Sequence, residues 1–195
     1  ITYHFLYLLK QSHMNKILYT LLTFPLLFLY SCAKDESNQQ QLYEIGQFTE
    51  GGIVFYIDNS GEHGLIAAME DINNINEWGC LSTYVDGADK FILGSGYQNT
   101  LDIINFDCTT ELGDTNTASA LSVELFHNGF DDWYLPSRDE LYYMYLNIGK
   151  GGIGENYNLG MFSNSSYWSS TESNSFNAWT VNFTTGSSTS MLKNT

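Results

Sequence analysis

The stretch DDWYLPSRDEL, from Asp131 to Leu141, constrains the fold more than any other part of the sequence. Ser137 and Glu140 have the spacing of a capping box, in which the two side chains satisfy free N–H groups at the start of a helix. Beyond them, apolar residues recur at i, i+3, i+4 and i+7 up to Ile148, and a glycine-rich segment begins at Gly149. The sequence therefore predicts a short strand that leads directly into a packed helix.

Short runs rich in β-branched and aromatic residues predict strands on both sides of this helix. Residues 52–57 and 64–69 flank the turn-forming segment Asp58 to Gly61 and should form a hairpin. A first helix is expected over residues 116–127. Further strands are expected over residues 167–171 and 178–183 and after Gly186. The 195-residue chain is therefore expected to contain one α+β domain.

The region from Asp71 to Asp114 has no apolar periodicity and is rich in Asn, Gly, Asp and Thr, which predicts a long irregular segment. Cys80 and Cys108 lie toward its two ends. A disulfide between them would close a loop of about 28 residues and stabilise the fold by roughly 3–4 kcal/mol. A pair of reduced, buried cysteines is the alternative. A metal site is not expected here, because neither cysteine has a second thiol or a histidine at ligand spacing.

The N-terminal part has the composition of a secretory signal peptide. Met14-Asn15-Lys16 is followed by an apolar run of about 13 residues, which is too short to span a bilayer, and then by Leu29-Tyr30-Ser31-Cys32. This ending resembles a bacterial lipobox, which implies cleavage before Cys32 and lipidation of its thiol. An ordinary signal peptide with an incidental cysteine is the alternative. Residues 1–13 are interpreted as upstream translated sequence, or alternatively as an extra membrane-associated segment.

Residues 33–41 form a polar run without an apolar period, and residues 33–45 are expected to be a flexible tether. Lys34-Asp35-Glu36 resembles the signal by which some lipoproteins of the Bacteroidetes type reach the outer face of the cell, with a solvated linker as the alternative. The expected organisation is an upstream segment and signal peptide over residues 1–32, a tether over 33–45 and a folded domain over 46–195. The protein is thus expected at the surface of the outer membrane, held there by lipid alone.

The charge of the chain excludes several classes of partner. All 22 acidic residues and five of the seven basic residues lie beyond Cys32, so this part carries a formal net charge of −17. Nucleic acids and sulfated polymers bind to arrays of Lys and Arg, which this part lacks. Charged residues make up 15% and aromatic residues 15%, which is typical of a folded acidic domain. No nucleic-acid partner is expected, and any glycan partner should be neutral or carry a bridging cation.

Several short motifs occur in a fixed order between residues 46 and 193. They are Gly51 to Phe55, His63 to Ala68, Trp78-Gly79-Cys80, Asn99-Thr100, Asp132 to Ser137, Glu140-Leu141, Tyr145, Tyr167 to Glu172 and Ala178-Trp179. In this order they resemble the C-terminal domain family first known from the Legionella collagen-like adhesin, a module of exported bacterial proteins. The resemblance implies a C-type-lectin-like fold with a small twisted antiparallel sheet, two helices and long loops, as in formylglycine-generating proteins.

The chain departs from this family in two respects. The family often has a further cysteine in the helix that here holds Ala118 to Leu125, so the pairing of Cys80 with Cys108 is the simplest option that remains. The family also usually continues past the position of Thr195 into a closing strand. Truncation at the C-terminus, with an unpaired sheet edge, is therefore expected.

The expected function is non-enzymatic. His63 and His127 belong to no nucleophile–base set, and the cysteines that formylglycine-generating relatives use are expected to be paired here. The first hypothesis is adhesion by binding of a surface glycan or protein, because Trp and Tyr rings among Asn and Ser side chains suit such ligands. The candidate ligand-binding residues are Trp78, Tyr97, Asn99, Trp133, Tyr134, Trp168 and Trp179.

Two alternatives to this function stay open. One is a structural envelope lipoprotein that binds no small ligand. The other is a calcium-binding surface module, because Ca²⁺ takes its oxygen ligands from acidic loops. The EF-hand pattern and the lectin calcium motifs are absent, and solubilising acids explain the same residues. The candidate calcium ligands are Asp86, Asp89, Asp131 and Asp132, and no other cofactor is expected.

Overall fold

A computed structural model describes residues 4–5, 9–12, 43–69, 71–72 and 76–195. The expected signal peptide after Met14, Cys32 and most of the tether lie outside the described residues. Within the described ranges, no helix is long and apolar enough to cross a membrane.

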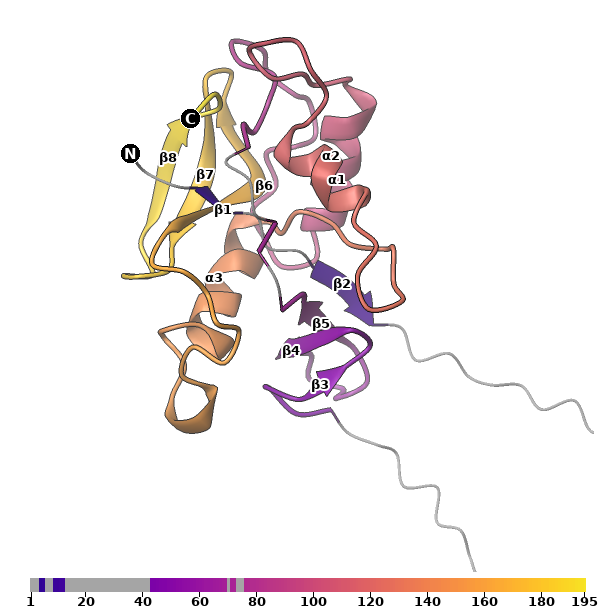
Figure 1. The fold of residues 1–195 in the computed structure, drawn as a ribbon, viewed down its shortest axis with the longest axis vertical. Coiled ribbons are helices and arrows are strands. Elements are labelled where there is room, and N and C mark those ends of the chain that lie inside the picture. The colour runs from indigo at the N-terminus through magenta and orange to yellow at the C-terminus, as the bar shows by residue number, and fades with distance from the viewer. Residues whose placement is uncertain (1–3, 6–8, 13–42, 70, 73–75) are drawn as a thin grey trace, which may run out of the picture.

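The chain forms an α+β structure with two small sheets (Figure 1), which confirms the predicted class. One sheet has the order β1-β6-β7-β8 and the other β2-β5-β4-β3, and all neighbouring strands are antiparallel except β1 and β6. The strands are β1 (His4–Phe5), β2 (Leu9–Ser12), β3 (Phe48–Thr49), β4 (Gly52–Ile57), β5 (Gly64–Ala67), β6 (Ser166–Asn174), β7 (Asn177–Asn182) and β8 (Ser188–Leu192). The helices are α1 (Gly96–Asn105), α2 (Ala118–Val123), α3 (Arg138–Ile148) and the 3-10 turn η1 (Gly154–Asn156).

The expected strands and hairpin are present. β4 and β5 form the predicted hairpin, and β6, β7 and β8 occupy the three segments expected near the C-terminus. β1 and β2 come from the segment interpreted as upstream sequence, and their backbones extend the sheets at β6 and β5. β8 forms the other edge of its sheet among the described strands.

Helix α3 begins with the predicted capping box. The Glu140 backbone N–H donates to Ser137 Oγ at 3.3 Å, and the Ser137 N–H donates to Glu140 Oε2 at 2.7 Å. The second carboxylate oxygen, Oε1, accepts the N–H of Gly94 at 2.7 Å. Burial raises the pKa of Glu140, while these backbone hydrogen bonds oppose the shift. The capping residue therefore also fixes the loop that precedes α1.

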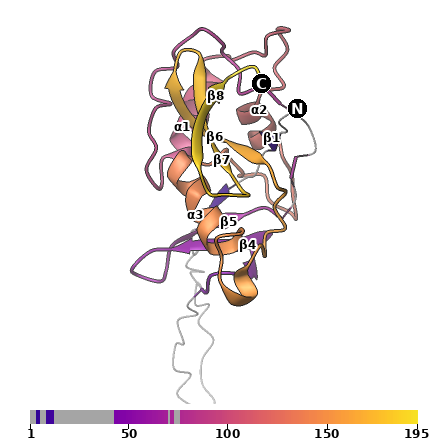
Figure 2. The same ribbon diagram turned by 90° about the vertical axis from the view of Figure 1, so that its left-hand side faces the viewer.

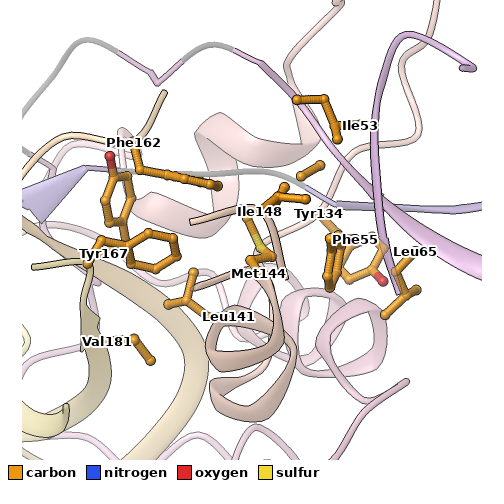
Figure 3. Close-up of a cluster of buried hydrophobic side chains, with 12 residues drawn as sticks. Ile53, Phe55, Leu65, Tyr134, Leu141, Met144, Ile148, Phe162, Tyr167 and Val181 are labelled. Atoms are coloured by element: carbon orange, nitrogen blue, oxygen red, sulfur yellow. The ribbon is translucent and has the colours of Figure 1, made fainter. Parts of the chain in front are cut away.

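Helix α3 lies between the two sheets and contributes to the main core (Figures 1, 2 and 3). Its apolar face, with Leu141, Met144 and Ile148, packs against β4 and β5 on one side and against β6 and β7 on the other. The opposite face of the β6–β7 pair carries Trp168 and Ala178, which pack with α1 and α2 in a second core cluster. Successive side chains of these strands point to opposite faces of the sheet, so one sheet contributes to two core clusters.

The described residues form three α-helices, where two were expected. Residues 96–105, within the region predicted to be irregular, form α1. Its buried positions have helical spacing, but Gly96, Asn99 and Thr100 are not apolar, and only Ile103 gives the usual signal. Helix α2 is shorter than the predicted 116–127. It ends at Val123, and the chain then forms a turn in which His127 pairs with Phe130.

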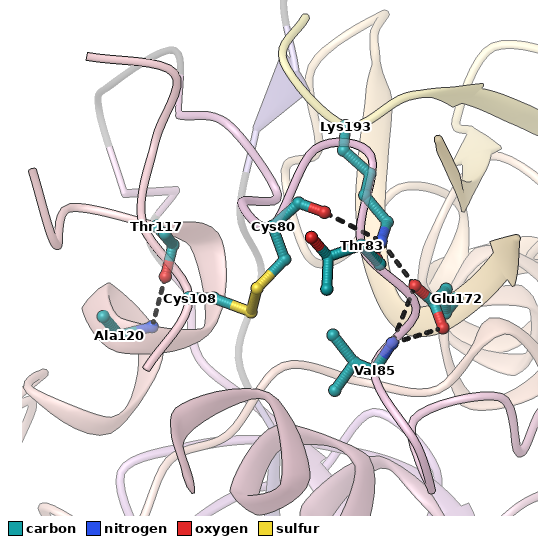
Figure 4. Close-up of a disulfide and its surroundings, with 8 residues drawn as sticks. All are labelled: Cys80, Thr83, Val85, Cys108, Thr117, Ala120, Glu172 and Lys193. Atoms are coloured by element: carbon teal, nitrogen blue, oxygen red, sulfur yellow. Dashed lines mark hydrogen bonds and ion pairs between the residues drawn. A yellow bond between two sulfur atoms is a disulfide. The ribbon is translucent and has the colours of Figure 1, made fainter. Parts of the chain in front are cut away.

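The predicted disulfide between Cys80 and Cys108 is confirmed, with a Cα–Cα distance of 4.8 Å (Figure 4). It joins the segment before α1 to the segment after it. The irregular loops of this region are therefore linked covalently. The disulfide stabilises a region that has little regular backbone pairing.

A buried ion pair lies beside the disulfide (Figure 4). Lys193 and Glu172 are in direct contact, and both side chains are completely buried. The Lys193 ammonium also donates to the carbonyl of Thr83 at 2.8 Å and to that of Cys80 at 3.3 Å. Burial raises the pKa of Glu172 and lowers the pKa of Lys193, and their mutual contact opposes both shifts. Each charge is therefore tolerated here because the other is present.

Candidate functional site

Three of the predicted ligand-binding tryptophans are core residues. Trp78, Trp133 and Trp168 are at most 2% exposed. Their indole N–H groups donate to the carbonyls of Ser169, Phe130 and Asn76, at 2.8, 3.2 and 3.0 Å in that order. The expectation that they offer rings to a ligand is wrong, because both the rings and the N–H groups are occupied inside the protein.

Asn99 and Tyr134 are also buried, which corrects their predicted role in direct binding. The Asn99 amide donates to the carbonyl of Lys90 at 2.6 Å, and Tyr134 belongs to the main core cluster. Tyr97 packs edge-on against Tyr134 but is 52% exposed. Among the seven candidates, Tyr97 and Trp179 thus keep contact with solvent.

Trp179 forms a surface cluster with Phe91 and Arg138, which we call the aromatic platform. The Arg138 guanidinium carbon lies 4.3 Å from the centre of the Phe91 ring and 5.3 Å from that of the Trp179 ring. Phe91 is 47% exposed, and the Arg138 side chain is 26% exposed. Two rings and one cation are therefore brought together at the surface by cation–π contacts.

The fold explains why these three residues meet. Trp179 points to the same face of β7 as the core residue Val181. Arg138 is the first residue of α3, and its N–H donates to Thr171 Oγ1 on β6 at 3.0 Å. The strand therefore carries its tryptophan to the start of α3, where Arg138 lies over the ring.

Phe91 lies on a loop that side chains from the start of α1 and from β6 hold in place. The carbonyl of Lys90 accepts hydrogen bonds from Ser95, Asn99 and Thr171 at 3.1, 2.6 and 3.0 Å. The carbonyl of Phe91 itself accepts the N–H of Asp139 at 3.0 Å. The platform thus rests on a well-anchored backbone, although the loop has no regular structure.

Asp139 neutralises Arg138 at this surface. Both Nε and Nη2 of Arg138 donate to Asp139 Oδ1, at 3.0 and 2.9 Å. Within the described part of the chain, Arg138 Nη1 and Asp139 Oδ2 have no hydrogen-bond partner. The pair therefore keeps unused N–H donors and one unused acceptor oxygen next to the two rings, with no net charge.

The four candidate calcium ligands are all exposed. Asp89 accepts a hydrogen bond from the Tyr84 hydroxyl at 3.0 Å. Among the described residues, no group of three or more His, Cys, Asp or Glu side chains could hold a metal ion. A site at Asp86, Asp89, Asp131 or Asp132 stays a prediction.

Asp58, Ser60 and His63 lie together in the turn between β4 and β5, but they do not have the geometry of a catalytic triad. The Ser60 hydroxyl donates to Asp58 Oδ1, and both Ser60 and Asp58 approach the same ring nitrogen of the histidine, Nδ1, at 3.4 Å. A triad needs the serine and the carboxylate on opposite nitrogens. These contacts instead stabilise the turn.

A cleft of about 490 Å³ lies between the segments around Glu77 and Asp114, and two clefts of about 530 and 360 Å³ are lined in part by Cys108 and by Cys80. The first is lined by Glu77 and Asp114, among other polar residues. Glu77 accepts the N–H of Glu111 at 2.7 Å, and Asp114 accepts that of Asn116 at 2.9 Å, so both carboxylates hold the loop. None of these clefts contains a predicted ligand-binding residue.

Sequence reasoning did not select Phe91, Arg138 or Asp139 as binding residues. Phe91 lies in a loop without periodicity, so no pattern marked it. The Arg-Asp pair that follows the capping serine was the available signal, because it fixes a charge pair at the start of a packed helix. Comparison of the chain with protein-family models and with curated proteins finds no match.

Proposed function

We propose that this protein is a non-enzymatic lipoprotein of the outer membrane surface, and that its C-type-lectin-like domain adheres to a surface glycan or protein through the aromatic platform. The observation that carries this proposal is the cluster of Phe91, Arg138 and Trp179, in which partly exposed rings flank a neutralised arginine. Aromatic and arginine side chains dominate binding surfaces, because they bury much area and still form hydrogen bonds.

The binding proposal is tested with the full lipoprotein in detergent, applied to arrays of glycans and of surface proteins. Trp179→Ala should weaken the binding of the ligand at least about tenfold, which corresponds to about 1.4 kcal/mol. Tyr157→Ala is the matched control, because Tyr157 is 61% exposed but lies near η1, away from the platform in sequence and fold. Equal binding by both variants and the wild type would count against the platform.

The lipid anchor is tested at the predicted modification site. Cys32→Ala should abolish incorporation of labelled fatty acid and release the protein from the membrane fraction, because a thiol is needed for lipidation. Ser31→Ala, which keeps a small residue before the cysteine, should leave both unchanged. A mature protein that still begins at Met14, found by mass spectrometry of membranes, would contradict the proposed anchor.

A structural envelope lipoprotein without a small ligand is the second candidate. It is favoured by the burial of five of the seven predicted binding residues, which leaves few of them able to contact a ligand directly. Failure of both arrays to identify any ligand sensitive to Trp179→Ala would support this candidate.

A further inference from the structure

The loop that follows α3, residues 149–161, carries three exposed apolar side chains. Ile153 is 90% exposed, and Tyr157 and Met161 are both more than half exposed. Single exposed apolar residues are common on protein surfaces, but here three of them lie within one short loop. We call this segment the apolar loop.

Backbone hydrogen bonds hold the two ends of the apolar loop together. The N–H of Asn158 donates to the carbonyl of Gly149 at 2.8 Å, and the N–H of Gly160 donates to the carbonyl of Ile148 at 3.0 Å. The residues between these contacts form the closed orange loop below α3 in Figure 1. Leu159 packs against the main core, so the base of the loop is fixed. A loop that is fixed in this way loses little further entropy when it binds a surface.

The chain enters the folded domain beside the apolar loop. A Cβ atom at Gly46 would lie 2.5 Å from Asn156 Oδ1 and 3.0 Å from Leu159 Cδ2, so Gly46 is in contact with the loop. Tyr43, shortly before Gly46, is 11 positions after Cys32, the proposed lipidation site. A chain spans at most about 3.6 Å per residue, which holds Tyr43 within about 40 Å of the bilayer.

A lipid on Cys32 makes contact between the apolar loop and the bilayer an intramolecular event. A short linker gives effective concentrations on the order of 1 mM, so a few apolar side chains suffice for contact that would be too weak in a free protein. Isoleucine and methionine favour the apolar boundary, and a tyrosine ring favours the membrane–water interface. The charged residues of the loop are Lys150 and Glu155, whose charges cancel. No net charge therefore has to approach the lipid.

Exposure alone does not distinguish the apolar loop from the rest of the surface. Leu112 is 91% exposed, but it lies between Glu111 and Asp114 in the segment before α2. Figures 1 and 2 both place α2 at the opposite end of the molecule from the apolar loop. Nearby carboxylates disfavour contact with the apolar boundary of a membrane. Leu112 thus provides a position of equal exposure at which no membrane contact is expected.

From these observations we propose that the apolar loop docks on a zwitterionic lipid surface beside the anchor, with Ile153, Tyr157 and Met161 in contact with lipid. This inference rests on the proposed lipidation of Cys32 and adds the orientation of the domain. Helix α3 has 11 residues and is about 16 Å long. The apolar loop follows its last turn, while Arg138 of the aromatic platform begins its first. Docking therefore holds the platform away from the bilayer.

The test couples the full protein to phosphatidylcholine vesicles that contain a maleimide-bearing lipid. Cys80 and Cys108 are joined, so the third cysteine, Cys32, provides the thiol for coupling. In Ile153→Trp, lipids with brominated acyl chains should quench most of the fluorescence that the new tryptophan adds to that of the wild type. Leu112→Trp is the matched control and should gain fluorescence that these lipids do not quench. Equal quenching of the two added tryptophans would overturn the inference.

A charge introduced into the apolar loop separates docking from folding. With Tyr157→Trp as the probe, the additional substitution Ile153→Asp should lower the ratio of docked to undocked loop about tenfold, because it replaces an apolar contact by a charge. Leu112→Asp adds the same charge to the chain and should leave the quenching of the probe unchanged. Ile153 and Leu112 are both exposed, so neither substitution should change the melting temperature. Quenching that resists both substitutions would refute the assigned contact.

Coupling through maleimide makes this test independent of lipidation in the cell. Absence of fatty acid from the native protein would refute the proposed anchor, whereas quenching of Ile153→Trp on the maleimide vesicles would still support the affinity of the loop for lipid. A native protein that carries lipid, together with an Ile153→Trp probe that stays in water on these vesicles, would preserve the anchor and refute the docking loop.

Discussion

Replacement of Lys193 by alanine is expected to lower the free energy of unfolding by about 3–5 kcal/mol, because it leaves a carboxylate buried without its counter-charge. The Glu172 side chain is completely buried, and among the described residues its carboxylate then keeps the N–H of Val85, at 3.0 Å from Oε2. The substitution also removes the donor to the carbonyls of Cys80 and Thr83. It further removes the cation that lies 4.6 Å from the centre of the Trp78 ring.

Chemical denaturation of the full protein measures this effect, and the melting temperature should fall by roughly 6–20 °C for a chain of this size. Lys150→Ala is the matched control, because Lys150 is partly exposed in the loop after α3 and should change stability by less than about 0.5 kcal/mol. The double variant Lys193→Met, Glu172→Gln should recover part of the loss, since no unpaired charge is then buried. Equal stability of Lys193→Ala and Lys150→Ala would show that the buried pair contributes little.

Local signals allowed part of the fold to be predicted. The capping box at Ser137 depends on residues three apart, so its spacing alone identified the start of α3. The hairpin of β4 and β5 follows from a turn flanked by apolar runs. The disulfide follows from the number of cysteines left once Cys32 is assigned to lipid. Each of these features requires no knowledge of distant contacts.

Polar residues inside the protein explain most of the errors. β6 is buried over Ser166 to Glu172, although five of these seven side chains carry hydroxyls and would suit a surface strand. The Ser169 hydroxyl donates to the carbonyl of Trp179 at 2.7 Å, and that of Thr171 donates to the carbonyl of Lys90 at 3.0 Å. Such pairs remove the cost of burial, but their partners lie on other elements and cannot be identified from sequence.

The candidate site illustrates the same limit. Aromatic type and polar neighbours selected seven residues, but in this chain the same composition fills the second core cluster with Trp78 and Trp168. What distinguishes Trp179 is its place on β7 beside the first turn of α3, which brings Arg138 over its ring. Composition therefore identified the residue type of the platform, while its location depended on the packing of α3 against the sheet.

Removal of the disulfide by the double variant Cys80→Ala, Cys108→Ala is expected to lower the free energy of unfolding by about 3–4 kcal/mol, the chain-entropy value for a separation of 28 residues. Both cysteines are replaced together so that no free thiol remains. Chemical denaturation under non-reducing conditions measures the loss, and the wild type under reducing conditions should show a similar decrease. A double variant as stable as the oxidised wild type would contradict this expectation.

The disulfide and Lys193 should also prove energetically coupled, because both hold the segment that contains Cys80. The disulfide fixes the side chain of Cys80, while the Lys193 ammonium binds its carbonyl and the Lys193 carbonyl accepts the N–H of Trp78 at 2.8 Å. Once either the disulfide or Lys193 is removed, the segment that contains Cys80 can move. The interaction that remains then keeps only part of its contacts with this segment. Combining Lys193→Ala with the cysteine variant should therefore cost less than the sum of the separate losses, by about 0.5–3 kcal/mol. If the two losses of unfolding free energy are strictly additive, the disulfide and Lys193 stabilise independent parts of the fold.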